Sequence, residues 1–256
     1  MTSQKRALNA KAKIATVSFL LECTPLIRAA MEGHVDAAKV LLKRGAKVDQ
    51  TDTKKGWTPL SWAARNGHDE VVKLLLAEGA SVEKASNSGR SPLMWAAHNG
   101  HEDTVHLLKT HDASVHAADN DGRTALILAA SNGHESIVEA LSRMGANIDA
   151  VSKDGRTALM LAAVKGHEAV MEALLDMGAT IDAVSEDGRT ALMHAVASAR
   201  EGAVETLLKR HAKVHIADEA GETASSLARS GKSKGIVDKI QKCIEAEDNQ
   251  EPDGPS

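Results

Sequence analysis

The hexamer DGRTAL occupies residues 121–126, and the same six letters return at residues 154–159 and 187–192. Each copy begins 33 residues after the one before it. A catalytic loop is needed once per active site, so three copies at one spacing indicate a repeated structural element. Within the hexamer, Asp-Gly favours a tight turn because both residues tolerate positive φ, and Thr before Ala-Leu is typical of a helix start.

The threonine of the hexamer belongs to a longer series of Thr or Ser residues. Its members are Thr24, Thr58, Ser91, Thr124, Thr157, Thr190 and Thr223, separated by 34 residues once and by 33 residues five times. The first three copies begin TPL or SPL, and the next three begin TAL. Gly-His follows in five copies, from Gly33-His34 to Gly166-His167. The chain is therefore expected to be built from about seven similar units.

Each unit reads as a turn, a short helix, a second turn and a second helix. The Thr hydroxyl caps the first helix, and a glycine closes each helix in the left-handed conformation. At the end of the second helix, Asp112 and His211 replace glycine and are expected to adopt that conformation too. One such unit is too thin to bury its apolar faces, so stacked units are needed to form a core.

The 33-residue period, the T-P-L-x-x-A-A pattern, Gly-His and a closing Gly-Ala resemble ankyrin repeats. The resemblance covers residues 20–241 and implies an all-α, curved solenoid of helix-turn-helix units with short β-hairpin fingers. It comprises six clear repeats and a degenerate C-terminal cap repeat, where Ser225 and Ser226 replace apolar residues. Residues 1–19 are interpreted as a basic leader or N-terminal cap, and residues 242–256 as an acidic, disordered tail.

The composition and the missing motifs argue against several classes of function. The formal net charge is −4, and the chain has no Tyr and one Phe, which disfavours nucleic acid as a partner. No apolar run is long enough for a membrane span, and two distant cysteines suit a reducing compartment. Catalytic motifs are missing, and the twelve histidines show no ligand spacing, so we expect no enzyme activity, no cofactor and no metal.

The resemblance implies a non-catalytic protein–protein interaction module that binds through its concave face and fingers. The alternatives are a reader of small ligands or nucleic acid, and a regulatory subunit or assembly chaperone of an enzyme complex. The expected partner is another protein, with no nucleic acid, no membrane insertion and a monomeric state. The expected location is the cytoplasm, with the nucleus as an alternative, and organelle targeting by the basic N-terminus is less favoured.

Positions that vary between units are free to carry binding specificity. The candidate partner-binding residues are Trp57, Arg90, His98, Asn99, Arg123, Arg156 and Arg189, with Met94 and Met160 beside them if they line the groove. Trp57 is either an exposed anchor or a packing residue, whereas Trp62 and Trp95 occupy packing positions. The arginines either pair with the neighbouring Asp121, Asp154 and Asp187 or bind carboxylates of an acidic partner.

Overall fold

The computed structural model describes residues 23–231 and 233–248. The chain divides into two compact units, Met1–Ser114 and Val115–Ser256. Helices are the only regular secondary structure of the described residues, which confirms the predicted all-α class.

The helices come in pairs, each with a first helix and a second helix. In the first unit the pairs are α2 (Pro25–Glu32) with α3 (Val35–Lys43), α4 (Pro59–Asn66) with α5 (Asp69–Ala77), and α6 (Pro92–Asn99) with α7 (Glu102–Thr110). In the second unit they are α8 (Ala125–Ser131) with α9 (Glu135–Arg143), α10 (Ala158–Lys165) with α11 (Glu168–Asp176), α12 (Ala191–Ala197) with α13 (Glu201–Lys209), and α14 (Ala224–Ser230) with α15 (Lys234–Asp248).

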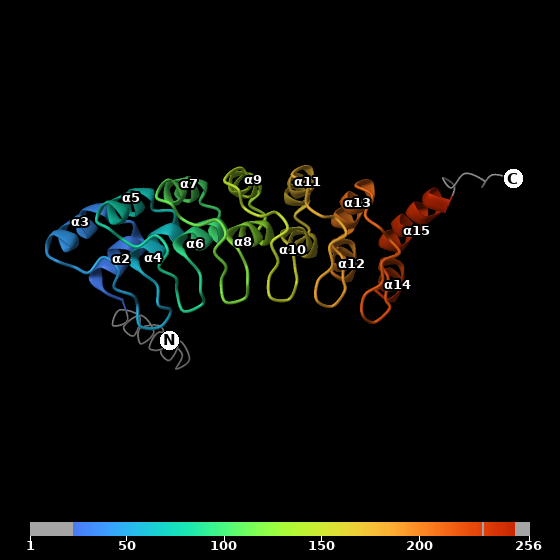
Figure 1. The fold of residues 1–256 in the computed structure, drawn as a ribbon, viewed down its shortest axis with the longest axis horizontal. Helices are drawn as coiled ribbons and strands as arrows, with labels where there is room; N and C mark the ends of the chain where they lie inside the picture. The colour runs from blue at the N-terminus through green and yellow to red at the C-terminus, as the bar shows by residue number, and fades with distance from the viewer. Residues whose placement is uncertain (1–22, 232, 249–256) are drawn as a thin grey trace, which may run out of the picture. The chain divides into compact units, whose positions relative to one another are not determined.

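Within each unit, first helices pack against first helices and second helices against second helices. In the first unit, for example, α4 contacts α2 and α6, while α5 contacts α3 and α7. Figure 1 shows the result in each unit as two rows of helices, with long loops projecting from the row of first helices. Buried alanines such as Ala96, Ala129 and Ala163 let the first helices approach closely.

The sequence signals for helix ends are confirmed. Each member of the Thr/Ser series caps a first helix, as where the Thr157 hydroxyl accepts the backbone N–H of Met160 at 3.3 Å. Asp112 and His211 both adopt φ of 63°, as expected for residues that replace glycine. Ala199 also adopts a positive φ, 52°, at the place where other units have the glycine of Gly-His.

The predicted β-hairpin fingers are present as loops rather than as paired strands. In the described residues, the only β pairing is two isolated bridges, Ala118 with Thr124 and Ala217 with Thr223. In these two loops only one residue separates the first bridge residue from the turn, so the paired segment is too short to form a ladder. We call the loops of this kind fingers: residues 52–57, 86–90, 119–123, 152–156, 185–189 and 218–222.

The sequence predicted a leader at the N-terminus and a disordered tail at the C-terminus. The helix α15 continues to Asp248, so residues 242–248 are helical where the sequence predicted the start of a disordered tail. The remainder of that tail and the predicted N-terminal leader, residues 1–19, lie outside the described residues. In the described part of the chain, no helix is long and apolar enough to cross a membrane.

Candidate partner-binding surface

One residue organises each finger, and we call it the base residue. The base residues are Asp52, Ser86, Asp119, Ser152, Ser185 and Asp218, and all of them are buried. The side chains of Asp52, Asp119, Ser152 and Asp218 accept backbone N–H groups of their own finger, as where Asp119 Oδ1 binds the N–H of Asp121 and Arg123 at 3.0 Å. This series was not predicted from the sequence, although Asp or Ser recurs there every 33 or 34 residues.

Successive fingers are joined by backbone hydrogen bonds. In the second unit, the N–H of Lys153 binds the carbonyl of Asp121 at 2.8 Å, and the N–H of Glu186 binds that of Asp154 at 3.1 Å. The glycine after each aspartate then lies against the backbone of the next finger. The glycine of DGRTAL is therefore required for the close stacking of the fingers as well as for the tight turn.

The arginines of the second unit are half-buried and bound to aspartates. The Arg123 guanidinium contacts Asp121 and Asp119, and Arg156 Nε lies 3.2 Å from Asp154 Oδ2. Arg189 Nε lies 2.9 Å from Asp218 Oδ2 in the next finger, and this hydrogen bond is the main reason why the pKa of Asp218 falls below its usual value. These contacts support the interpretation of the arginines as members of ion pairs.

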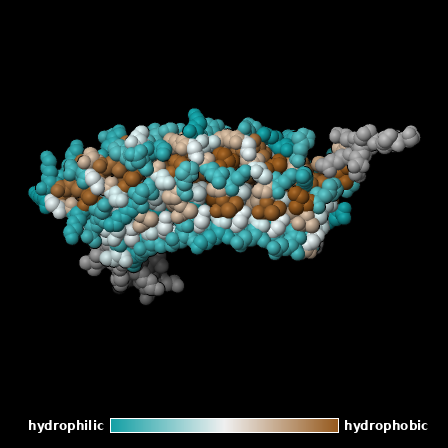
Figure 2. Space-filling view, in the orientation of Figure 1, coloured by the Kyte–Doolittle hydropathy of each residue, from teal (hydrophilic) through white to brown (hydrophobic). Residues whose placement is uncertain are grey.

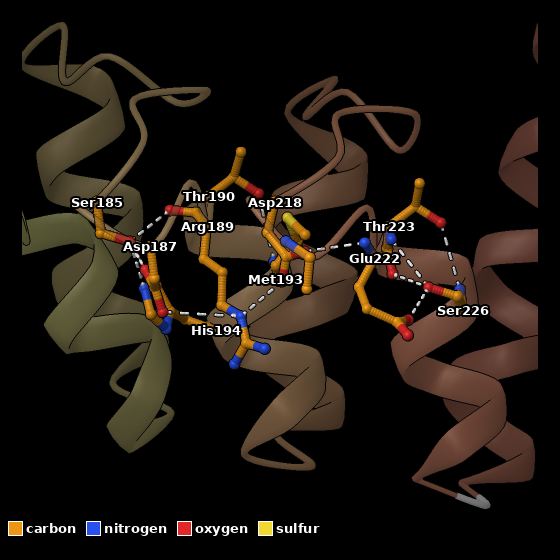
Figure 3. Close-up of polar contacts among 11 residues, drawn as sticks. Ser185, Asp187, Arg189, Thr190, Met193, His194, Asp218, Glu222, Thr223 and Ser226 are labelled. Atoms are coloured by element: carbon orange, nitrogen blue, oxygen red, sulfur yellow. Dashed lines mark hydrogen bonds and ion pairs between the residues drawn. The ribbon is translucent and has the colours of Figure 1, made fainter.

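Figure 3 shows that Asp187 and His194 both approach the base residue Ser185. The Ser185 hydroxyl donates to Asp187 Oδ1 at 2.5 Å, which is the main cause of the lowered pKa of Asp187. His194 Nε2 lies 3.1 Å from Ser185 Oγ, and burial is the main cause of its lowered pKa. The Ser185 hydroxyl also lies 2.9 Å from the carbonyl of Arg189, so it has two acceptors within its own finger.

Two histidines of the Gly-His pairs join neighbouring repeats of the first unit. His68 Nε2 lies 3.0 Å from the carbonyl of Met31, and His101 Nε2 lies 2.9 Å from that of Arg65. In the described residues, no group of three or more His, Cys, Asp or Glu side chains is arranged to hold a metal ion.

Trp57 is not an exposed anchor, which corrects that part of the sequence interpretation. Its side chain is buried, with 5% of the residue exposed. The ring centroid lies 4.4 Å from that of Trp62 and 4.2 Å from that of Trp95, so the three indoles form one cluster. The apolar ring gains more by packing between its neighbours than by facing water.

The other candidates of the first unit lie around this cluster. The Arg90 guanidinium lies 4.7 Å from the centroid of Trp95, and His98 meets the same ring edge-on at 6.0 Å. Asn99 Nδ2 donates to the carbonyl of Trp95 at 2.8 Å. Met94 is fully buried, as is Met160 in the second unit, so neither offers side-chain surface to a partner.

A groove of about 440 Å³ opens beside the cluster. Its lining residues are Lys55, Trp57, Arg65, Asn87, Ser88 and Trp95. We call it the tryptophan groove. On the face shown in Figure 2, hydrophilic residues line the edges and several hydrophobic patches lie between them.

The indole N–H groups of Trp62 and Trp95 differ in their partners. Trp62 Nε1 donates to Asp52 Oδ2 at 3.1 Å, whereas the buried Trp95 Nε1 has no acceptor among the described residues. In the finger before Trp95, the base residue equivalent to Asp52 is Ser86. Its Oγ lies 3.0 Å from Ser88 Oγ and is not an acceptor for the indole N–H. An unsatisfied buried N–H costs roughly 1–3 kcal/mol.

The change Ser86→Asp is therefore expected to stabilise the first unit by about 1 kcal/mol, because a carboxylate there supplies the missing acceptor. Chemical unfolding followed by circular dichroism measures the free energy of unfolding. In a double-mutant cycle, Trp95→Phe should cost more in the Ser86→Asp protein than in the wild type, since only the variant then loses a hydrogen bond. Equal costs would contradict the assignment, and Ser86→Ala is the control that adds no acceptor.

The candidate residues thus fall into two groups. The first group lies in or around the tryptophan cluster of the first unit: Trp57, Arg90, His98 and Asn99. The second group lies on consecutive fingers of the second unit: Arg123, Arg156 and Arg189.

A family model described as "Ankyrin repeats (3 copies)" matches residues 5–86, 78–152 and 144–218, which is more than half of the chain. The comparison with curated proteins finds no significant match.

Proposed function

Because this chain belongs to the ankyrin-repeat family, we propose that it is a non-catalytic module that binds another protein through its fingers and first helices. Ankyrin repeats are generally protein–protein interaction modules. The observation that supports the proposal here is the contrast between constant buried positions and variable finger positions. The caps and buried alanines recur in every full repeat, while the finger sequence changes from DTKKGW at residues 52–57 to SNSGR at residues 86–90 and DNDGR at residues 119–123.

The chemistry of the fingers fits binding rather than catalysis. Their buried serines and aspartates are engaged in turn hydrogen bonds, and the hydroxyl closest to a histidine, that of Ser185, has two acceptors within its own finger. Most of the exposed finger side chains are charged or amide groups, which provide orientation and specificity in protein interfaces; the exceptions are Thr53, Ser88 and Ala220. We place the protein in the cytoplasm as a monomer, in line with the expectation from its composition.

The proposal is tested by affinity capture from native extract with three matched baits. These are the wild type, a finger variant with Arg123→Ala, Arg156→Ala and Arg189→Ala, and a second-helix variant with Lys73→Ala, Lys109→Ala and Arg143→Ala. Each variant removes three positive charges, so general charge effects are equal. We expect a saturable partner protein that binds the wild type and the second-helix variant and binds the finger variant at least about fivefold more weakly.

Circular dichroism confirms that all three baits are folded before the comparison. A partner lost only from the second-helix variant would contradict the binding surface proposed here. Turnover of a small molecule by the pure protein would contradict the non-catalytic assignment.

A further inference from the structure

The fingers of the first unit carry a different charge pattern from those of the second. In the second unit, Asp121, Asp154 and Asp187 each stand two residues before the finger arginine and pair with it. The equivalent residues in the first unit are Lys55, two residues before Trp57, and Ser88, two residues before Arg90. The aspartate that neutralises the other fingers is therefore replaced by a cation and by a neutral residue.

The cations of the tryptophan groove lie against aromatic rings. Lys55 Nζ is 4.8 Å from the centroid of Trp57, and the Arg65 guanidinium carbon is 5.6 Å from it. Among the described residues, no carboxylate lies within 4.0 Å of either cation. Cation–π contacts hold such groups in place without cancelling their charge, so both remain available to an anion.

The one acidic base residue beside the groove, Asp52, is already engaged. Its Oδ1 accepts the N–H groups of Lys55 and Gly56, and its Oδ2 accepts the indole N–H of Trp62. The carboxylate is buried among these donors, with 6% of the residue exposed. It therefore stabilises the finger and does not occupy the groove.

We propose that the tryptophan groove binds an acidic segment of the partner protein, an inference that rests on the proposed function. A glutamate side chain matches the lining of the groove: its carboxylate would pair with Lys55 and Arg65, and its apolar stem would pack against the partly buried Trp95. Asn87 and Ser88 line the groove from the next finger and are held there, Asn87 by the carbonyl of Lys54 and Ser88 by the hydroxyl of Ser86. Charge complementarity selects an acidic ligand, and the indoles provide the desolvated surface that makes such a pair strong.

A nucleic acid is the less favoured ligand for this groove. Binding of single strands requires ring faces on which successive bases stack. Here the ring of Trp57 is already packed against Trp62 and Trp95, at centroid distances of 4.4 and 4.2 Å. The formal net charge of −4 also opposes a polyanion.

The sequence provides a direct reporter for this site. Trp57, Trp62 and Trp95 are the only tryptophans, and the chain has no tyrosine, so the intrinsic fluorescence arises almost entirely from this cluster. The experiment selects ligands from a random peptide library displayed on phage, using the full-length protein as bait. Enriched peptides are then synthesised and titrated into the protein while tryptophan fluorescence is recorded. We expect the enriched peptides to be rich in Glu and Asp and to change the fluorescence saturably.

Two double variants with equal charge change locate the binding. Lys55→Glu with Arg65→Glu reverses the groove cations, and Lys39→Glu with Lys43→Glu reverses two exposed lysines of the second helix α3. We expect the groove variant to bind the selected peptides roughly tenfold or more weakly, and the control variant less than about threefold more weakly. Lys55→Gln with Arg65→Gln gives the same test if charge reversal disturbs folding.

Several results would overturn the assignment. The selection would contradict it if no peptide were enriched or if the enriched peptides lacked acidic residues. The titrations would contradict it if both double variants lost the same affinity for the peptides, or if the protein bound a 20-nucleotide oligothymidine more tightly than any peptide. A partner captured from extract that binds the groove variant as tightly as the wild type would also overturn it. That last outcome leaves the proposed function standing, because the partner would still depend on other fingers.

Discussion

The Gly155→Ala protein is expected to be less stable than the wild type by about 3 kcal/mol. Gly155 has φ of 71°, and a Cβ atom there would lie 2.6 Å from the backbone nitrogen of Glu186 in the next finger. The left-handed conformation alone costs alanine about 1–2 kcal/mol. The contact with Glu186 adds to this because backbone must move, which strains the hydrogen bond from Glu186 N–H to the Asp154 carbonyl.

A matched glycine separates the two contributions. Gly145 has φ of 88°, yet a Cβ atom there would meet no atom within 4 Å. Gly145→Ala should therefore show only the conformational cost of about 1–2 kcal/mol. Unfolding by guanidinium, followed by circular dichroism, gives the free energy for both variants. Equal losses would show that contact between adjacent fingers contributes nothing to the requirement for glycine in DGRTAL.

The Trp57→Ala protein is expected to lose about 3–5 kcal/mol of stability, whereas an exposed anchor could be removed with little effect on folding. The ring packs between Trp62 and Trp95, and Ile27 belongs to the same cluster. Its removal leaves a cavity in the core of the first unit, and the near-ultraviolet circular dichroism of the two remaining indoles should change with it.

Arg156→Ala is the control for this prediction, since it changes the equivalent finger position in the second unit. Its side chain is about one-third exposed and pairs with Asp154, which is more than half exposed. Such a pair contributes at most about 1 kcal/mol. If the melting temperature of Trp57→Ala lay within a degree of that of Arg156→Ala, the burial of Trp57 would contribute little to stability. The interpretation of Trp57 as an exposed anchor would then be favoured.

Much of the local structure could be predicted from the sequence because local interactions decide it. The hydroxyl of Thr157 caps its helix through a contact three residues away, and the left-handed Asp112 follows from the short side chain that stands in for glycine. The series of buried base residues was equally readable, since Asp119 and Ser152 recur at the 33-residue spacing. A single Asp or Ser in a loop does not by itself indicate a buried, turn-forming residue; only its recurrence at the repeat spacing does.

The sequence by itself determined the period, the helix ends and the need for stacked units, because these depend on contacts within about one repeat. Tertiary structure decided which side chains are available to a partner. Trp57 occupies a finger position held by arginine elsewhere, and its burial depends on Trp62 and Trp95 meeting it from two different first helices. In the same way, the pairing of Arg189 with Asp218 joins two fingers. Exposure and charge compensation are properties of neighbours brought together by folding, so the sequence pattern of one repeat does not contain them.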